Sequence, residues 1–198
     1  MTRGYWDKPL PPRLIDGLAF EHRARDACGK KCRVALAERV CFEQDVIGPK
    51  AGLQLARLAS ETHGARGIEA ASAAGIDSIE HGTFADEAAL KVMKAKGTAL
   101  VPTLMALEGV RARLGKGIYT ATVEVKAKQA VEAAGRQVRR AKAMGVTVAF
   151  GTDAGVFEHG RNGSEFALLV NAGMTPTEAL ASATSVAAKT LGLENEIG

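Results

Sequence analysis

The pattern of apolar and polar positions changes character near residue 50. Residues 1–49 show only a short apolar period around 34–40, among clustered Arg, Lys, Cys and Pro, so we assign no regular architecture to them. From Gly52 onward, helical apolar periods alternate with short apolar runs typical of strands. We therefore divide the chain into an unassigned N-terminal segment, 1–49, that is irregular or helical, and one α/β domain, 50–198.

The first part of this domain predicts two helices and a strand. Apolar residues within 53–59 share one side of a helix, and 68–74 forms a second short helix. Gly75 closes that helix, because glycine tolerates the left-handed helix end. The apolar run 76–80 predicts a strand that ends at His81.

A helix over 87–96 has signals at both ends. Asp86 can cap its start and Gly97 can close it. A strand over 98–101 follows, and Pro102 stops it because proline has no backbone N–H to donate to a sheet.

The central part of the domain combines a loop, a long helix and the most strand-like run of the chain. Residues 103–120 contain two Gly-containing turns and form a loop or a broken helix over the mouth of the fold. One long amphipathic helix spans 122–144 and stops at Gly145. The apolar, β-branched run 146–150 is typical of a strand that is buried on both faces.

The C-terminal part predicts two more helices. One covers 164–171 and ends at Gly173, and the other begins at a capping box, Thr175-Pro-Thr-Glu178, with proline at the first helical position. The second helix runs to about Thr190. Alternating helices and strands in this order predict parallel strands joined by right-handed crossovers.

Composition narrows the functional class. With 198 residues, 46% hydrophobic and 24% charged, the chain is typical of one globular domain. It has no apolar run long enough to cross a membrane, and 1–16 does not resemble a signal peptide, so we expect a cytoplasmic protein. The charge of +4 is dispersed and aromatic residues make up only 5%, which argues against nucleic acid as a partner. Cys28, Cys32 and Cys41 lack the spacing of a zinc or redox motif and are read as free thiols.

Two predicted strands end in a potential metal ligand, His81 and Asp153. In a parallel (β/α) barrel the residues after each strand meet at one open rim, where active sites lie. An imidazole nitrogen and a carboxylate oxygen there suit Zn²⁺, and the carboxylate could also accept a proton from an attacking water. Taken singly, a hydrogen-bonded histidine at a strand end and an aspartate in a turn remain open alternatives.

Several motifs follow one another in a fixed order along the chain. They are His63-Gly-Ala-Arg-Gly-Ile-Glu-Ala-Ala, Ala74-Gly-Ile-Asp-Ser-Ile-Glu-His-Gly82, Leu100-Val-Pro-Thr-Leu104, Ala149-Phe-Gly-Thr-Asp-Ala-Gly155, His159-Gly160 with Asn162, and Gly173-Met-Thr-Pro-Thr-Glu-Ala-Leu180. In these motifs and their order the chain resembles the amidohydrolase superfamily, above all its prolidase-like and imidazolonepropionase-like members. The resemblance covers about the last 140 residues. It implies a partial TIM-type (β/α) barrel, with about strands five to eight and their helices.

The resemblance also implies a centre of zinc or another divalent metal at the barrel mouth. On that mapping His81 is the ligand after strand six, and Asp153 is the ligand after strand eight and the catalytic base. His63 is a weaker candidate ligand, because Glu61 stands where the family usually has the preceding histidine. His159 is a candidate substrate contact. The family's His-x-His pair after strand one occurs nowhere in this sequence.

These observations support two functional hypotheses. The first is a metal-dependent hydrolase of peptide or cyclic amide C–N bonds, with a small molecule or dipeptide as substrate. The second is a truncated, non-catalytic remnant that self-associates or binds without turnover, since a half barrel exposes strand edges and an apolar face. In either case we expect a homo-oligomer.

Overall fold

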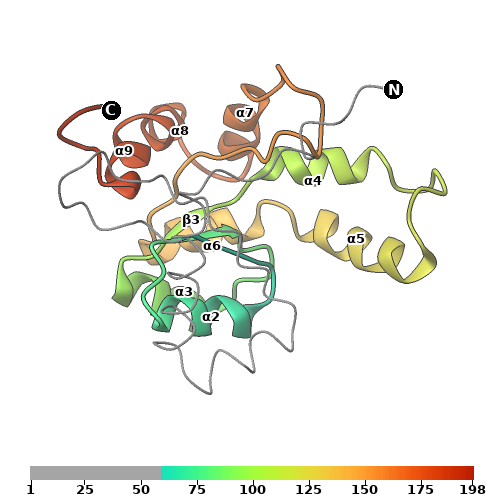
Figure 1. Cartoon of the computed structure of the whole chain (residues 1–198), viewed down its shortest axis with the longest axis horizontal. Helices are drawn as coiled ribbons and strands as arrows, with labels where there is room; N and C mark the ends of the chain where they lie inside the picture. Colours follow the sequence, from blue (N-terminus) through green and yellow to red (C-terminus); the bar gives the residue numbers. More distant parts are fainter. Residues whose placement is uncertain (1–58) are drawn as a thin grey trace, which may run out of the picture.

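The computed structural model describes residues 59–198, which form a mixed α/β structure around a parallel sheet (Figure 1). The strands are β1 (Ala59–Thr62), β2 (Ser78–His81) and β3 (Ala99–Val101). The helices are α2 (Ala65–Ala73), α3 (Glu87–Lys96), α4 (Leu104–Arg111), α5 (Ala121–Ala133), α6 (Arg136–Met144), α7 (Ser164–Asn171), α8 (Pro176–Ala183) and α9 (Ser185–Leu191). The assignments made for 1–49, for the boundary at 50 and for a helix within 53–58 lie outside these residues. Ala59, expected on that helix, instead begins β1.

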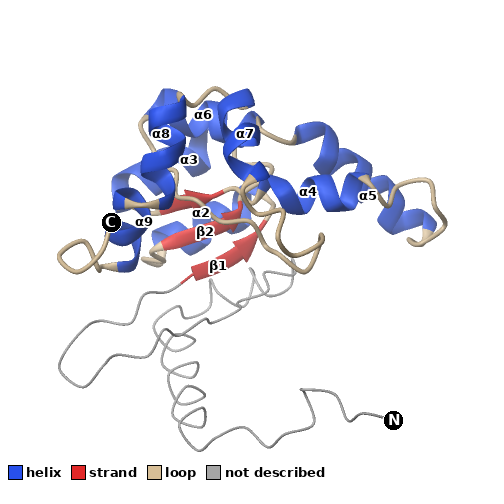
Figure 2. Cartoon of the chain, turned by 90° about the horizontal axis from the view of Figure 1, so that it is seen from above, coloured by secondary structure: helices blue, strands red, loops and turns tan. Residues whose placement is uncertain are grey.

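The strands lie in the order β1-β2-β3, and both pairs are parallel, as predicted (Figure 2). Helix α2 connects β1 to β2, and α3 connects β2 to β3. Since each connection returns the chain to the same end of the sheet, the three strands end at a common edge. The residues that follow the strands therefore meet there.

The hydrophobic core lies on one face of the sheet. Ile79 and Leu100 point from the strands into it and are fully buried. They pack with Ile68 of α2, Leu90 of α3 and Val138 of α6, which are also fully buried. Figure 2 shows α3 and α6 gathered on one side of the strands. The sheet is thus covered by helices on the face away from its Glu61 and Glu80 positions, which are in register with each other.

The two helices with the clearest end signals form as predicted. The Asp86 side chain accepts a hydrogen bond from Ala89 N at 2.9 Å and begins α3, and Gly97 ends it with φ 73°. Helix α8 begins with the complete capping box of Thr175 and Glu178. In both cases, residues at the helix ends were sufficient to predict where the helix begins or ends.

The single helix predicted over 122–144 is wrong, because the chain breaks between α5 and α6. Ala134 is extended and Gly135 adopts φ 78°, a left-handed conformation that favours glycine. The break lets α5 follow α4 away from the body of the molecule while α6 packs on α3 (Figure 1). Gly135, inside the predicted helix, was the residue in the sequence that could have indicated this break.

The full strand predicted over 146–150 is reduced to one bridge, between Val148 and Leu100 of β3. Two backbone hydrogen bonds form it, Leu100 N to Thr147 O at 2.8 Å and Ala149 N to Leu100 O at 2.9 Å. Pro102 ends β3 just beyond, and the N–H of Phe150 turns to Ser182 O of α8 at 3.0 Å. The position beside β3 is therefore occupied as predicted, without a regular ladder.

The hydrogen bond from Phe150 N to Ser182 O also explains why a second helix prediction is wrong. The helix predicted to continue to about Thr190 is divided into α8 and α9 at Thr184 (φ −120°, ψ −101°), two residues after the Ser182 carbonyl that Phe150 uses. Residues 103–120, expected to be a loop or broken helix, contain α4. No helix of the described residues is long and apolar enough to span a membrane.

Candidate active site at the strand ends

Three non-glycine residues of the described chain adopt left-handed backbone conformations, one at the end of β2, one two residues after β3 and one five residues after the bridge at Val148. They are His81 (φ 68°), Thr103 (φ 47°) and Asp153 (φ 52°). This conformation costs an L-residue roughly 1–2 kcal/mol. Such strain clusters at functional sites, where surrounding contacts hold it in place. His81 ends β2 as the sequence predicted, whereas Asp153 follows the isolated bridge at Val148 by five residues, so its strand-end role stays a prediction.

The His81 ring is held from two directions. Its Nδ1 lies 2.6 Å from Thr103 Oγ1 of the neighbouring strand end. On its face the His63 ring stacks with centroids 4.7 Å apart and planes 7° from parallel. His63 in turn places its Nδ1 2.8 Å from Thr83 Oγ1. In both histidines Nδ1 is thus engaged by a hydroxyl, which leaves Nε2 as the nitrogen available to another partner.

The surroundings favour neutral rings. Burial of the ring, and then the nearby His81, lower the pKa of His63 to about 4, although the residue as a whole is exposed, so that water weakens this shift. Burial also lowers the pKa of His81, and the negative charge of Asp153 acts in the opposite direction. A neutral imidazole keeps a lone pair on one nitrogen, which is the form that binds a metal or accepts a proton.

Asp153 is an exposed residue at this edge, close enough for its charge to act on His81. Its neighbour Thr152 is buried, and the Thr152 hydroxyl accepts a hydrogen bond from Asn162 Nδ2 at 2.9 Å. That bond joins Asn162, near the end of the loop that carries Asp153, to Thr152 at its start. The arrangement places an accessible carboxylate beside a held imidazole.

A buried carboxylate stabilises the helix that begins at this edge of the sheet. Glu165, in the first turn of α7, is fully buried, and its two oxygens accept hydrogen bonds from Leu104 N at 2.9 Å and Met105 N at 2.7 Å. It therefore caps the N-terminus of α4, the helix that starts directly after Thr103. Burial raises the pKa of Glu165 to about 7, and the two backbone hydrogen bonds oppose that shift.

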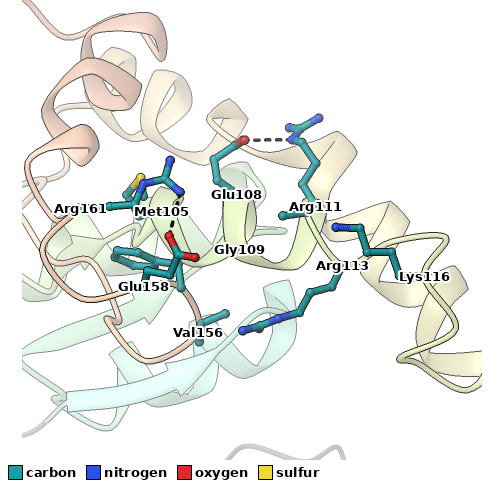
Figure 3. Close-up of a pocket in the computed structure, with 11 residues that line it drawn as sticks. Met105, Glu108, Gly109, Arg111, Arg113, Lys116, Val156, Glu158 and Arg161 are labelled. Carbon is teal, nitrogen blue, oxygen red and sulfur yellow. Dashed lines mark hydrogen bonds and ion pairs between the residues drawn. The ribbon is translucent and has the colours of Figure 1, made fainter.

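A pocket of about 410 Å³ adjoins the loop that carries Asp153 (Figure 3). Its apolar wall includes Met105, Val156 and Phe157, and Val156 N donates to Asp153 O at 3.3 Å. Figure 3 shows Arg113 and Lys116 at one side of the pocket. Neither forms an ion pair within residues 59–198, whereas the other charged lining residues pair with each other, Glu108 with Arg111 and Glu158 with Arg161. The pocket is therefore apolar on one side and positively charged on the other.

The described residues do not provide a complete set of metal ligands. No group of three or more His, Cys, Asp or Glu side chains among them is placed to hold one ion. His63, His81 and Asp153 are thus not brought together as three ligands of a single metal. His81 and Asp153 remain a pair of suitable donor types, an imidazole nitrogen and a carboxylate. His159 is exposed in the loop whose neighbours Glu158 and Arg161 line the pocket.

The sequence interpretation missed Thr83, Thr103 and Glu165. The two threonines gave no pattern of their own beyond their position just after a strand. Glu165 did give one, because it precedes Leu169 and Ala172 by four and seven residues and so lies on the buried stripe of α7. A carboxylate on an apolar stripe signals a buried partner.

The chain belongs to the amidohydrolase family, whose model matches residues 54–198. It is 34% identical to ochratoxinase of Aspergillus niger over 151 residues, 76% of this chain and 31% of that enzyme. It is 40% identical to an uncharacterized protein of Mycobacterium tuberculosis over 120 residues, 60% of this chain and 32% of that protein. A crystal structure of a Xaa-Pro dipeptidase with methionine bound in its active site superposes with a TM-score of 0.68 and 42% identity, over 72% of this chain and 35% of that one. The chain thus spans about a third of the length of these relatives.

Proposed function

We propose that this chain carries the strand-six to strand-eight side of an amidohydrolase active site and acts on amide C–N bonds of small molecules or dipeptides. The observation that supports this most is the pair of left-handed residues His81 and Asp153, close enough to interact electrostatically. Relatives named as ochratoxinase and Xaa-Pro dipeptidase match 76% and 72% of this chain. The parallel sheet, with helices on one face, fits strands five to eight of a (β/α) barrel.

In this proposal the exposed Asp153 carboxylate accepts the proton of the attacking water and later returns it to the leaving nitrogen. His81, whose pKa burial lowers, offers Nε2 toward the same centre. His63 stacks on His81 and limits the rotation of that ring. A divalent cation such as Zn²⁺, when bound by His81, Asp153 and further ligands beyond residues 59–198, would supply polarisation of the amide carbonyl.

The pocket beside Asp153 is the place that we assign to the substrate. Its apolar wall suits a hydrocarbon side chain, and Arg113 and Lys116, which pair with no acidic side chain of the described part of the chain, suit a negatively charged group at its rim. His159 belongs to the same loop and is proposed as a further substrate contact. The pocket therefore favours amide substrates that carry an apolar side chain and a negatively charged group, and disfavours positively charged substrates.

Metal binding by the full chain tests the proposal. The wild type should take up about one equivalent of zinc, as a single amidohydrolase centre requires. The variants Asp153→Ala and His81→Ala should each weaken zinc binding by at least about tenfold. His159→Ala is the matched control, because it removes an exposed histidine of the same region without removing a proposed ligand. Equal zinc binding in all four proteins, or none in the wild type together with no hydrolysis of Xaa-Pro dipeptides, would refute the proposal.

A second candidate function, a non-catalytic remnant that self-associates, is favoured by two observations. The described residues lack a three-ligand metal cluster. In addition, α7 and α8 border an apolar groove of about 380 Å³, and Leu180 at its rim is 60% exposed. Sedimentation of the full chain together with metal analysis distinguishes the candidates. A concentration-dependent dimer without bound zinc supports the remnant, whereas about one equivalent of bound zinc, in a monomer or an oligomer, supports the enzyme.

A further inference from the structure

Thr103 occupies the N-cap position of α4 without capping it. A threonine there ordinarily accepts a hydrogen bond from a backbone N–H of the first helical turn. In this protein the Thr103 hydroxyl makes no such bond and lies instead 2.6 Å from His81 Nδ1. The N–H groups of Leu104 and Met105 are satisfied by Glu165, which comes from α7, about sixty residues later in the chain.

We propose that Glu165 is a positioning residue for His81: by capping α4 in place of Thr103, it leaves the Thr103 hydroxyl free to hold the His81 ring. The importance of His81 rests on the proposed function, but the chain of contacts from Glu165 to its ring does not. The link runs through two backbone hydrogen bonds, one left-handed residue and one side-chain hydrogen bond.

The burial of each member makes the link effective. Glu165 and Thr103 are exposed by 0% and 3%, so little water can replace either hydrogen bond. Helices α4 and α7 pack against each other, which fixes the distance between the carboxylate and the first turn of α4 (Figure 1). Thr103 has φ 47° and ψ 50°, a conformation that a β-branched residue rarely adopts without support on both sides. The Glu165 cap provides that support on the side of α4.

The consequence is that these contacts decide which ring nitrogen of His81 carries the proton. When Nδ1–H donates to the Thr103 oxygen, the proton is kept on Nδ1 and the lone pair remains on Nε2. Hydrogen bonds of this kind set the orientation and the tautomer of histidines at metal and catalytic sites. If Thr103 were released, its hydroxyl could return to the free N–H groups of α4, and the His81 ring would exchange between tautomers.

The experiment compares Glu165→Gln with Glu178→Gln in the full chain, at about pH 8, where an ordinary carboxyl is ionised. Both glutamates cap a helix N-terminus, but Glu178 is exposed and has no contact with the His81 region. Side-chain ¹⁵N NMR of histidine reports the tautomer, and His81→Gln assigns the His81 signals. We expect well-separated Nδ1 and Nε2 shifts in the wild type and in Glu178→Gln, and averaged shifts in Glu165→Gln.

A double-mutant comparison tests the route. Thr103→Val removes the hydroxyl while keeping the branched shape, and should average the His81 shifts by itself. Adding Glu165→Gln to it should then change the His81 spectrum no further, because the link is already broken. If Glu165→Gln does not fold, Glu165→Asp keeps the carboxylate at a shorter reach and should give a milder averaging.

Two results would overturn the inference: a Glu165 variant that lowers the melting temperature but leaves the His81 shifts as in Glu178→Gln, or a further change when Glu165→Gln is added to Thr103→Val. Neither measurement uses metal or substrate. A protein that fails to bind zinc would therefore refute the proposed function and leave this test intact.

Discussion

Two glutamates of this protein cap helices in opposite surroundings. Glu178 caps α8 from within its own first turn, is exposed, and accepts a hydrogen bond from Thr175 N at 2.7 Å. Glu165 caps α4 from another helix, is fully buried, and accepts two backbone hydrogen bonds. The hydrogen bond from Lys142, and then that from Thr175 N, lower the pKa of Glu178 to about 2, whereas burial raises that of Glu165 to about 7.

The comparison shows that the same hydrogen-bonding role can have opposite electrostatic consequences. Water and Lys142 stabilise the charged form of Glu178. Burial penalises the charged form of Glu165 more than its two backbone hydrogen bonds stabilise it, as the direction of its pKa shift indicates. A buried cap of this kind fixes a structure in place, while an exposed one mainly starts a helix.

The largest expected effect is that of Glu165→Ala, which should lower the free energy of unfolding by about 3 kcal/mol, because it strands two buried N–H groups and leaves a cavity. Urea denaturation followed by circular dichroism measures it. Glu178→Ala is the control and should cost clearly less, since water can reach the N–H groups that it exposes. Equal losses in the two variants would show that burial does not distinguish the caps.

The pH dependence of stability should have opposite signs for the two residues. The folded-state pKa of Glu165 lies above the ordinary value of 4.5, so its contribution is fully present below about pH 4.5 and is lost as the pH rises through about 7. The folded-state pKa of Glu178 lies below 4.5, so its contribution is present above about pH 4.5 and is lost as the pH falls toward 2.

Denaturation midpoints measured across this range, in the wild type and in the two Glu→Gln variants, test both signs. Glu165→Gln should flatten the decline in stability between about pH 5 and 8 and leave the acid side unchanged. Glu178→Gln should do the reverse. If the neutral-range slope survives in Glu165→Gln, the raised pKa is not its origin.

The local caps should give intermediate effects of similar size. Thr175→Ala and Asp86→Ala each remove a side-chain acceptor at a helix start, and each should cost about 1 kcal/mol. Thr177→Ala is the control, because it replaces an exposed threonine in the first turn of α8 that makes no capping hydrogen bond. A loss at Thr175 as large as that at Glu165 would remove the distinction between local and long-range capping.

The smallest effect on stability is expected for Lys142→Gln. Lys142 is partly exposed and bonds Glu178 Oε2 at 2.6 Å and Gly173 O at 2.9 Å. Exposed ion pairs contribute little to folding because water screens them. The pKa of Glu178 should nevertheless rise toward its ordinary value, since the hydrogen bond from Lys142 is the largest cause of its shift. Carboxyl ¹³C NMR titration of Glu178 reads this out; an unchanged pKa would assign the shift to Thr175.

The sequence predicted the elements whose signals are contained in one or two helical turns. Asp86 and Gly97 gave the ends of α3, and the Thr175 and Glu178 box gave the start of α8. The order of parallel strands followed from the alternation of elements, and the family followed from motifs at strand ends. The breaks at Gly135 and Thr184 were missed, because apolar periodicity continues across both. Gly135 was a local signal for the first break, whereas packing against other parts of the chain decides the second.

By itself, then, the sequence determined local capping, strand order and the position of His81 at the end of β2, because each depends on residues that are neighbours in the chain or on the fixed geometry of parallel connections. The tertiary structure alone decided that Thr103 holds His81, that His63 stacks on it, and that Glu165 caps α4. These contacts join residues from about 18 to 61 positions apart, and their energies depend on burial, which no short stretch of sequence specifies.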